Sequence, residues 1–163
     1  MKRSIAAAVV VAVVLGCVSL VGSAAAHRGH GHGHGHRVID ARLFGSHPLP
    51  PNGDGVTLFG VAPGGLPWVI AASRAKARRD GRIEVRLRGL LIPGVGVGPV
   101  RTITASLFCN GSPVGETAAV PLSPAGDARI RDTIPPPPHP CLVPAILVHP
   151  NGAEGLYIAA TGA

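Results

Sequence analysis

Proline and glycine recur so often along this chain that no long helix fits between them. The sequence holds 17 Pro and 23 Gly among its 163 residues. Pro breaks a helix hydrogen bond, and Gly costs conformational entropy inside helices and strands. No stretch after Ala26 carries a long apolar stripe with a 3.6-residue period. The spacing therefore predicts short strands between turns and argues against a helical bundle or a coiled coil.

The same residues raise the question of whether the chain folds at all, because frequent Pro and Gly are typical of low-complexity sequences. Leu, Ile, Val and Phe make up about a quarter of the residues after Ala26, above the roughly 20% below which chains tend to be disordered. We therefore expect one domain with a single core over residues 38–163.

Residues 1–26 have the features of a secretory signal peptide. Two basic residues precede an apolar stretch over 5–21, and Ala24-Ala25-Ala26 offers a cleavage site after Ala26 or, alternatively, after Ala24. An uncleaved membrane anchor and lipid attachment at Cys17 are the other interpretations. We expect a secreted protein that has no stable membrane span after cleavage.

Cys109 and Cys141 are the two cysteines that follow this signal. A pair of cysteines in an exported chain predicts a disulfide. Closing a loop of about thirty residues contributes on the order of 3 kcal/mol in the chain-entropy model. A metal site is less favoured, because neither cysteine belongs to a ligand-spaced cluster.

Histidine alternates with glycine near the start of the mature chain, in residues 27–37. Imidazole binds Zn, Ni and Cu, and glycine spacers let several rings reach one ion. We expect a disordered tail that binds divalent transition metal, with affinity falling as the pH drops through about 6.5. A solvated spacer is the alternative, and cleavage after Ala24 would create an Ala25-Ala26-His27 terminus for copper or nickel. The predicted ligands are His27, His30, His32, His34 and His36.

The clearest strand pair lies between Pro67 and Leu91. A three-residue turn over 79–81 pairs Lys76 with Glu84 and gathers apolar side chains on one face, whereas a two-residue turn mixes charged and apolar groups. We predict the three-residue turn, with Gly81 in the left-handed conformation. The other face then collects the cations Arg74, Lys76, Arg78, Arg82, Arg86 and Arg88.

This basic face predicts contact with anionic polymers of the cell envelope. The formal charge is +7 for the whole chain and falls to +5 when Lys2 and Arg3 leave with the signal. Aromatic side chains that would stack on bases are missing from these strands apart from Trp68 at one end, so nucleic acid is not an expected partner. A merely solvated strand face is the alternative.

Other short apolar runs between turn residues predict further strands. Asn110-Gly111 and Asn151-Gly152 are turn signals between such runs. About seven to nine strands in one domain favour an all-β antiparallel sandwich of the immunoglobulin type. The additional strands are expected at 38–44, 56–60, 100–109, 114–120, 128–134, 142–148 and 156–161.

Four short segments resemble an uncharacterised group of small exported bacterial all-β proteins. They are PWVIA at 67–71, SPAGDA at 123–128, HPNG at 149–152 and YIAATG at 157–162. The resemblance implies export and a sandwich fold. It carries no catalytic residues over to this chain.

Catalytic motifs are missing from the sequence. There is no HExxH, GxSxG or P-loop, and the glycines of segment 94–98 lead to Pro99 rather than to a helix. A composite site of His47, His139 and His149 is a minor alternative. We predict a non-enzymatic protein without an organic cofactor. Its first expected function is metal binding through the tail, and its second is a structural or adhesive role through the basic face.

Overall fold

The computed structural model describes residues 36–48 and 57–162. The predicted signal, Cys17 and the histidines from 27 to 34 lie outside this part. The described residues form strands and turns and contain no helix, so the all-β prediction is confirmed. None of the described segments is a helix with the length and hydropathy needed to span a membrane.

Twelve strands are present in the described residues, several of them only two or three residues long. They are β1 Arg37–Ala41, β2 Leu43–Gly45, β3 Ala62–Pro63, β4 Ala72–Arg78, β5 Arg82–Arg88, β6 Thr102–Cys109, β7 Ser112–Glu116, β8 Val120–Pro121, β9 Ala128–Thr133, β10 Ala145–Pro150, β11 Leu156–Tyr157 and β12 Ala159–Thr161.

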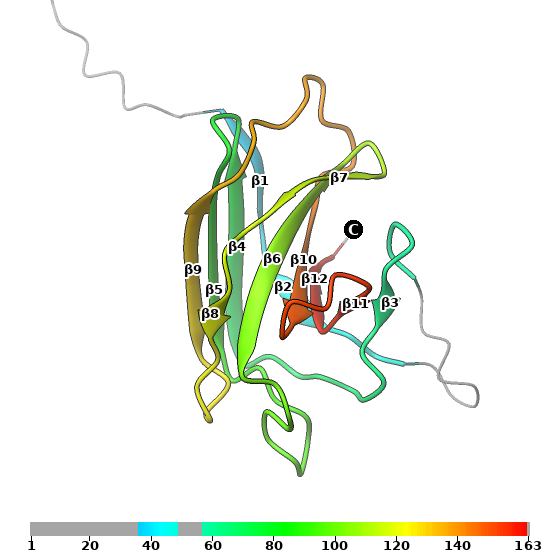
Figure 1. The fold of residues 1–163 in the computed structure, drawn as a ribbon, viewed down its shortest axis with the longest axis vertical. Coiled ribbons are helices and arrows are strands. Elements are labelled where there is room, and N and C mark those ends of the chain that lie inside the picture. The colour runs from blue at the N-terminus through cyan, green and yellow to red at the C-terminus, as the bar shows by residue number, and fades with distance from the viewer. Residues whose placement is uncertain (1–35, 49–56, 163) are drawn as a thin grey trace, which may run out of the picture. The chain divides into compact units, whose positions relative to one another are not determined.

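These strands form two main sheets, both antiparallel. The first has the order β1-β4-β5-β9, and the second has the order β2-β12-β10-β6-β7, with β8 also pairing with β6. Figure 1 shows β4, β5 and β9 side by side, with β6, β10 and β12 in a separate group. A short parallel pair, β3 with β11, completes the pairing.

Alternation along the strands separates a buried face from an exposed one. In β5, Ile83, Val85 and Leu87 are buried, while the residues between them are partly or fully exposed. Ile146 and Val148 of β10 belong to the same hydrophobic cluster as these β5 residues. Both main sheets therefore contribute to one core.

The hairpin between β4 and β5 has the predicted register. Lys76 pairs with Glu84 and Ala75 with Val85, and Gly81 has a φ of 83°. A side chain at Gly81 would also collide with the carbonyl oxygen of Ile134, whose amide donates to the Gly81 carbonyl at 3.0 Å. The glycine is thus required both by the turn and by the neighbouring chain.

The predicted strand over 38–44 is divided between the two sheets. β1 pairs with β4, whereas β2 pairs with β12, and Arg42 lies between them. The hydroxyl of Ser73 accepts a hydrogen bond from the Leu43 amide at 2.9 Å and donates one to the Leu43 carbonyl at 3.0 Å. The Ser73 hydroxyl therefore satisfies both the backbone amide and the backbone carbonyl of Leu43. Because the predicted strand is divided in this way and several other strands are very short, the prediction of seven to nine strands was too low.

Two other predicted strands are shorter than expected. Of the strand predicted over 56–60, Val56 lies outside the described residues. In the remainder, Leu58 forms only a single bridge to Val61, because Phe59 and Gly60 have positive φ angles and form a tight turn. The strand predicted over 142–148 begins at Ala145, after Val143 at a φ of 47°.

The predicted pairing of Cys109 with Cys141 is confirmed. Their sulfur atoms are bonded, and their Cα atoms lie 5.0 Å apart, a separation within the range of disulfides. Asn110 joins the same two segments, because its amide donates to the Leu142 carbonyl at 3.0 Å and its side chain accepts from the Leu142 amide at 2.7 Å. The end of β6 is therefore fastened to the segment that leads into β10.

Candidate functional site

The exposed face of β4, β5 and β9 is densely cationic, and we call it the basic face. Its side chains come from every second residue of each strand, because neighbouring residues point to opposite sides of a sheet. Its cations are Arg74, Lys76, Arg78, Arg82, Arg86, Arg88, Arg129 and Arg131.

The strand register places arginines directly opposite one another on this face. Arg74 pairs with Arg86, and Arg86 pairs in turn with Arg129 on the far strand. Like charges in such positions destabilise a sheet. Each arginine of this row has an acidic partner, Asp40 for Arg74 and Glu84 for Arg86 and Arg129. A row of aligned cations still lowers local stability, and such features are candidates for a functional role.

Glu84 lies beside this arginine row and holds it together. Its Oε1 atom accepts from Arg86 at 2.7 Å and from Arg129 at 2.9 Å, and lies 3.5 Å from Nε of Arg131. The hydrogen bond from Arg86 is the largest cause of the lowered pKa of this carboxyl. One carboxylate facing three guanidinium groups leaves a net positive charge.

Asp40 on β1 has a similar role at the neighbouring strand. It accepts from Nε of Arg74 at 2.7 Å and from Arg37 at 3.0 Å. The bond from Arg74 lowers the pKa of Asp40, so this carboxyl is ionised at neutral pH. Two acidic side chains thus position several cations without neutralising the face.

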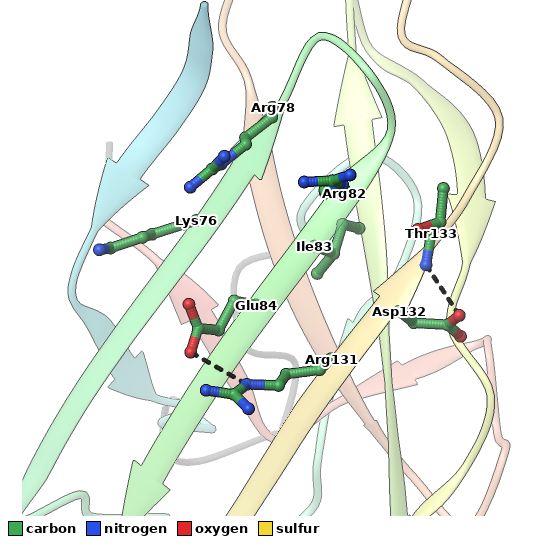
Figure 2. Close-up of a pocket in the computed structure, with 8 residues that line it drawn as sticks. All are labelled: Lys76, Arg78, Arg82, Ile83, Glu84, Arg131, Asp132 and Thr133. Carbon is green, nitrogen blue, oxygen red and sulfur yellow. Dashed lines mark hydrogen bonds and ion pairs between the residues drawn. The ribbon is translucent and has the colours of Figure 1, made fainter. Parts of the chain in front are cut away.

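A shallow hollow of about 350 Å³ opens on the basic face near the β4–β5 turn. Figure 2 shows Lys76, Arg78, Arg82 and Arg131 around it, with Glu84 reaching toward Arg131. Since these four cations share the hollow with few acidic groups, its charge suits an anionic ligand such as a sulfate or phosphate ester.

Asp132 also lines this hollow, but its oxygen atoms are already engaged. They accept from the Ala118 amide at 2.7 Å and from the Thr133 amide at 2.7 Å. These two backbone bonds lower the pKa of Asp132, the Ala118 bond more strongly. Its charge is directed toward the backbone rather than toward the lysine and arginines of the hollow.

The structure places all six cations predicted from the hairpin on this one face. Sequence reasoning missed Arg129 and Arg131, because it did not predict that β9 pairs with β5. The alternation of Arg129, Ile130 and Arg131 was the available signal, since it marks an apolar face and a cationic face within one short strand.

The predicted metal ligands are only partly within the described residues. His36 is exposed, and its carbonyl accepts from the Arg79 amide at 3.0 Å. Among the described residues, no three His, Cys, Asp or Glu side chains are grouped as metal ligands would be. His47, His139 and His149 therefore do not form the composite site considered as an alternative, and Nδ1 of His149 lies 2.7 Å from the Leu156 carbonyl oxygen.

Comparison with protein-family models, with curated proteins and with solved structures finds no match to this chain. The resemblance of the four short segments to small exported all-β proteins thus gains no support from these comparisons.

Proposed function

We propose that this protein is a non-enzymatic binding protein that acts outside the cytoplasm and holds anionic polymers on its basic face. The observation that carries the proposal is the aligned row of Arg74, Arg86 and Arg129 beside a cation-lined hollow. The signal-like residues 1–26 and the disulfide support a location outside the cytoplasm.

The arrangement of charge favours a polymer over a single small anion. Adjacent strands lie about 4.8 Å apart, and alternate residues of one strand lie about 6.7 Å apart. The cations therefore form a two-dimensional grid across three strands, rather than one deep cage. A chain carrying a sulfate, phosphate or carboxylate on each unit can contact several of them at once, with strong dependence on salt.

Glu84→Gln is expected to strengthen binding to dextran sulfate about three- to tenfold at pH 7 and low salt, because it frees three arginines from an internal carboxylate. The pKa of Glu84 is lowered in the folded protein. The stability that its ion pairs give the fold is therefore fully present above the ordinary pKa of this carboxyl, and it is lost as the pH falls through the lowered value. Wild type should therefore gain affinity only below about pH 4. Isothermal titration calorimetry measures both effects.

Glu154→Gln is the matched control, since Glu154 is an exposed residue of the turn before β11. It changes the net charge equally and should leave the affinity nearly unchanged. Equal gains in the two variants would show that net charge alone governs binding.

The architecture that presents the basic face is, on this proposal, an immunoglobulin-like sandwich. Support comes from the shared core and from the orders β4-β5-β9 and β12-β10-β6-β7, which correspond to strands A-B-E and G-F-C-C′. The disulfide departs from the usual B–F bridge, because it joins the end of β6 to the segment before β10. Nuclear Overhauser contacts between methyl groups of Val85 and those of Ile146 or Val148 would support face-to-face packing, and their absence would oppose it.

The tail carries a second proposed function, which the alternating histidines of residues 27–37 favour. Replacing His30, His32, His34 and His36 together by Gln should abolish tight binding of Zn, Ni or Cu, because imidazole is the preferred ligand present. In the wild type, affinity should fall as the pH drops through about 6.5. Calorimetry on the full chain tests this, and tight binding by the fourfold variant would place the site elsewhere.

A further inference from the structure

The side of the second sheet that faces away from the main core carries a second apolar cluster beside the buried polar residues Thr104, Ser106 and His149. Phe108 pairs with Ala145 across β6 and β10, and both belong to a second buried cluster with Leu147, Tyr157 and Ala160. Part of this surface is covered by the turn before β3. There the ring of Phe59 stacks on Phe108 with centroids 5.0 Å apart.

A hollow of about 460 Å³ lies next to this turn, and Phe59 is part of its lining. This volume is within the range of small-molecule pockets, roughly 300–1,000 Å³. Its described lining is mainly apolar and contains no Lys, Arg, Asp or Glu; His47, Thr161 and Tyr157 are among its few polar side chains. Burial raises the pKa of Tyr157, so its phenol stays neutral. The hollow thus suits an uncharged ligand.

The backbone around this hollow is unusual. Of the four described non-glycine residues with positive φ, two are asparagines, which tolerate that conformation, and the other two are Phe59 at 54° and Val143 at 47°. A β-branched residue at positive φ is a genuine outlier, and such strain clusters at ligand clamps. Both strained residues line the same hollow.

The rim of the hollow also presents apolar side chains to solvent. Phe44 is 63% exposed and Val143 is 68% exposed. Exposed apolar groups gathered at a concave site are typical of binding surfaces rather than of a merely solvated edge. The hollow therefore combines a volume suited to a small molecule, a lining without charged side chains, two residues with strained backbone and an exposed apolar rim.

We propose that this hollow binds a small, uncharged and mainly apolar molecule, with a ring or short acyl chain and one hydrogen-bonding oxygen. The ring or chain would lie against Phe44, Phe59 and Val143, while the oxygen would face the polar side chains of the lining. The site is independent of the basic face, since it involves none of the cations of β4, β5 or β9.

The test uses the neutral fluorescent probe N-phenyl-1-naphthylamine, with 1-decanol as competitor. We expect saturable binding of one probe per chain, displaced by 1-decanol and unaffected by dextran sulfate. Val143→Gly should weaken binding at least tenfold while raising the melting temperature, because glycine relieves the strain at positive φ. Ala160→Leu should weaken it similarly by filling the hollow.

Val95→Gly is the control, because Val95 is a valine of similar exposure that does not line this hollow. It should leave probe affinity unchanged. Circular dichroism checks that each variant folds. If Ala160→Leu does not fold, the probe affinity of Val143→Gly alone decides the test. Unchanged affinity in Val143→Gly, or probe binding only by chains that sediment as dimers, would overturn the proposal.

Discussion

Replacing Arg74, Arg86 and Arg129 together by Gln is expected to weaken dextran sulfate binding roughly 100-fold at about 0.1 M salt, since each cation–anion contact contributes up to about a factor of ten there. The three side chains form one row across β4, β5 and β9, so a bound polymer loses adjacent contacts. The slope of log K against log salt should fall by about two to three units. Calorimetric titrations at several salt concentrations measure both quantities.

A matched variant separates the basic face from net charge. Arg28, Arg42 and Arg101 lie outside β4, β5 and β9 in the sequence, and replacing them by Gln removes the same three charges. Their loss should weaken binding only slightly, by long-range attraction. If the two triple variants lost affinity equally, the basic face would have no special role and the protein would be a general polycation.

The fold should tolerate the face variant. All three arginines have exposed side chains. After their replacement Glu84 keeps its contact with Arg131, and Asp40 keeps its contact with Arg37. Exposed ion pairs contribute little to stability. An unchanged circular dichroism spectrum would therefore accompany the loss of binding.

Removing the disulfide is expected to have the largest effect on stability. The double variant Cys109→Ala with Cys141→Ser should lose about 3.7 kcal/mol of unfolding free energy, because the unfolded chain regains the freedom of a loop spanning 32 residues. The melting temperature should fall by roughly 10 °C for a domain of this size. Calorimetry and urea titration measure these changes. Alanine is chosen at position 109 because Cys109 is buried, and a serine there would leave a hydroxyl without a hydrogen-bond partner.

Chemical reduction of the wild type is the control for this variant. Reduced wild type and the double variant should melt at similar temperatures. Two reactive thiols in the native, unreduced protein, or an unchanged melting temperature after reduction, would contradict a stabilising bridge. Below its melting temperature the variant should still bind dextran sulfate, because the cystine does not line the hollow of the basic face.

The hairpin could be predicted from sequence because its information is local. Alternation on both arms and Gly81 at the turn together leave one register in which the apolar residues share a face. The disulfide could be predicted for a similar reason, since only two cysteines remain after the signal. The hairpin carries the six cations that were predicted, whereas the disulfide belongs to the end of β6 and the segment before β10.

The remainder depends on pairing between distant segments. β9 follows β5 by about forty residues, and no local pattern says which strand it joins, so Arg129 and Arg131 were not recognised. The division of 38–44 depends on partners as distant as β12. Phe59 and Val143, which line the apolar hollow, have positive φ angles. Aromatic and β-branched residues rarely adopt such angles, so the sequence did not predict them.

For the histidine tail the sequence is informative and the structure is not. Its composition gives a direct chemical prediction, yet the ligands from His27 to His34 lie outside the described residues. The proposals for the tail and for the basic face are independent, since one rests on imidazole and the other on guanidinium groups. Either can fail without the other.

The most direct measurement is a nuclear magnetic resonance titration of the full chain with dextran sulfate, following the backbone amides and the arginine Nε–Hε groups. We expect the shifts to concentrate on β4, β5 and β9, with the Nε–Hε signals of Arg74, Arg86 and Arg129 among the largest. The shifts should vanish at high salt. Shifts confined to other segments, or none at all at low salt, would contradict the assignment of the basic face as the binding site.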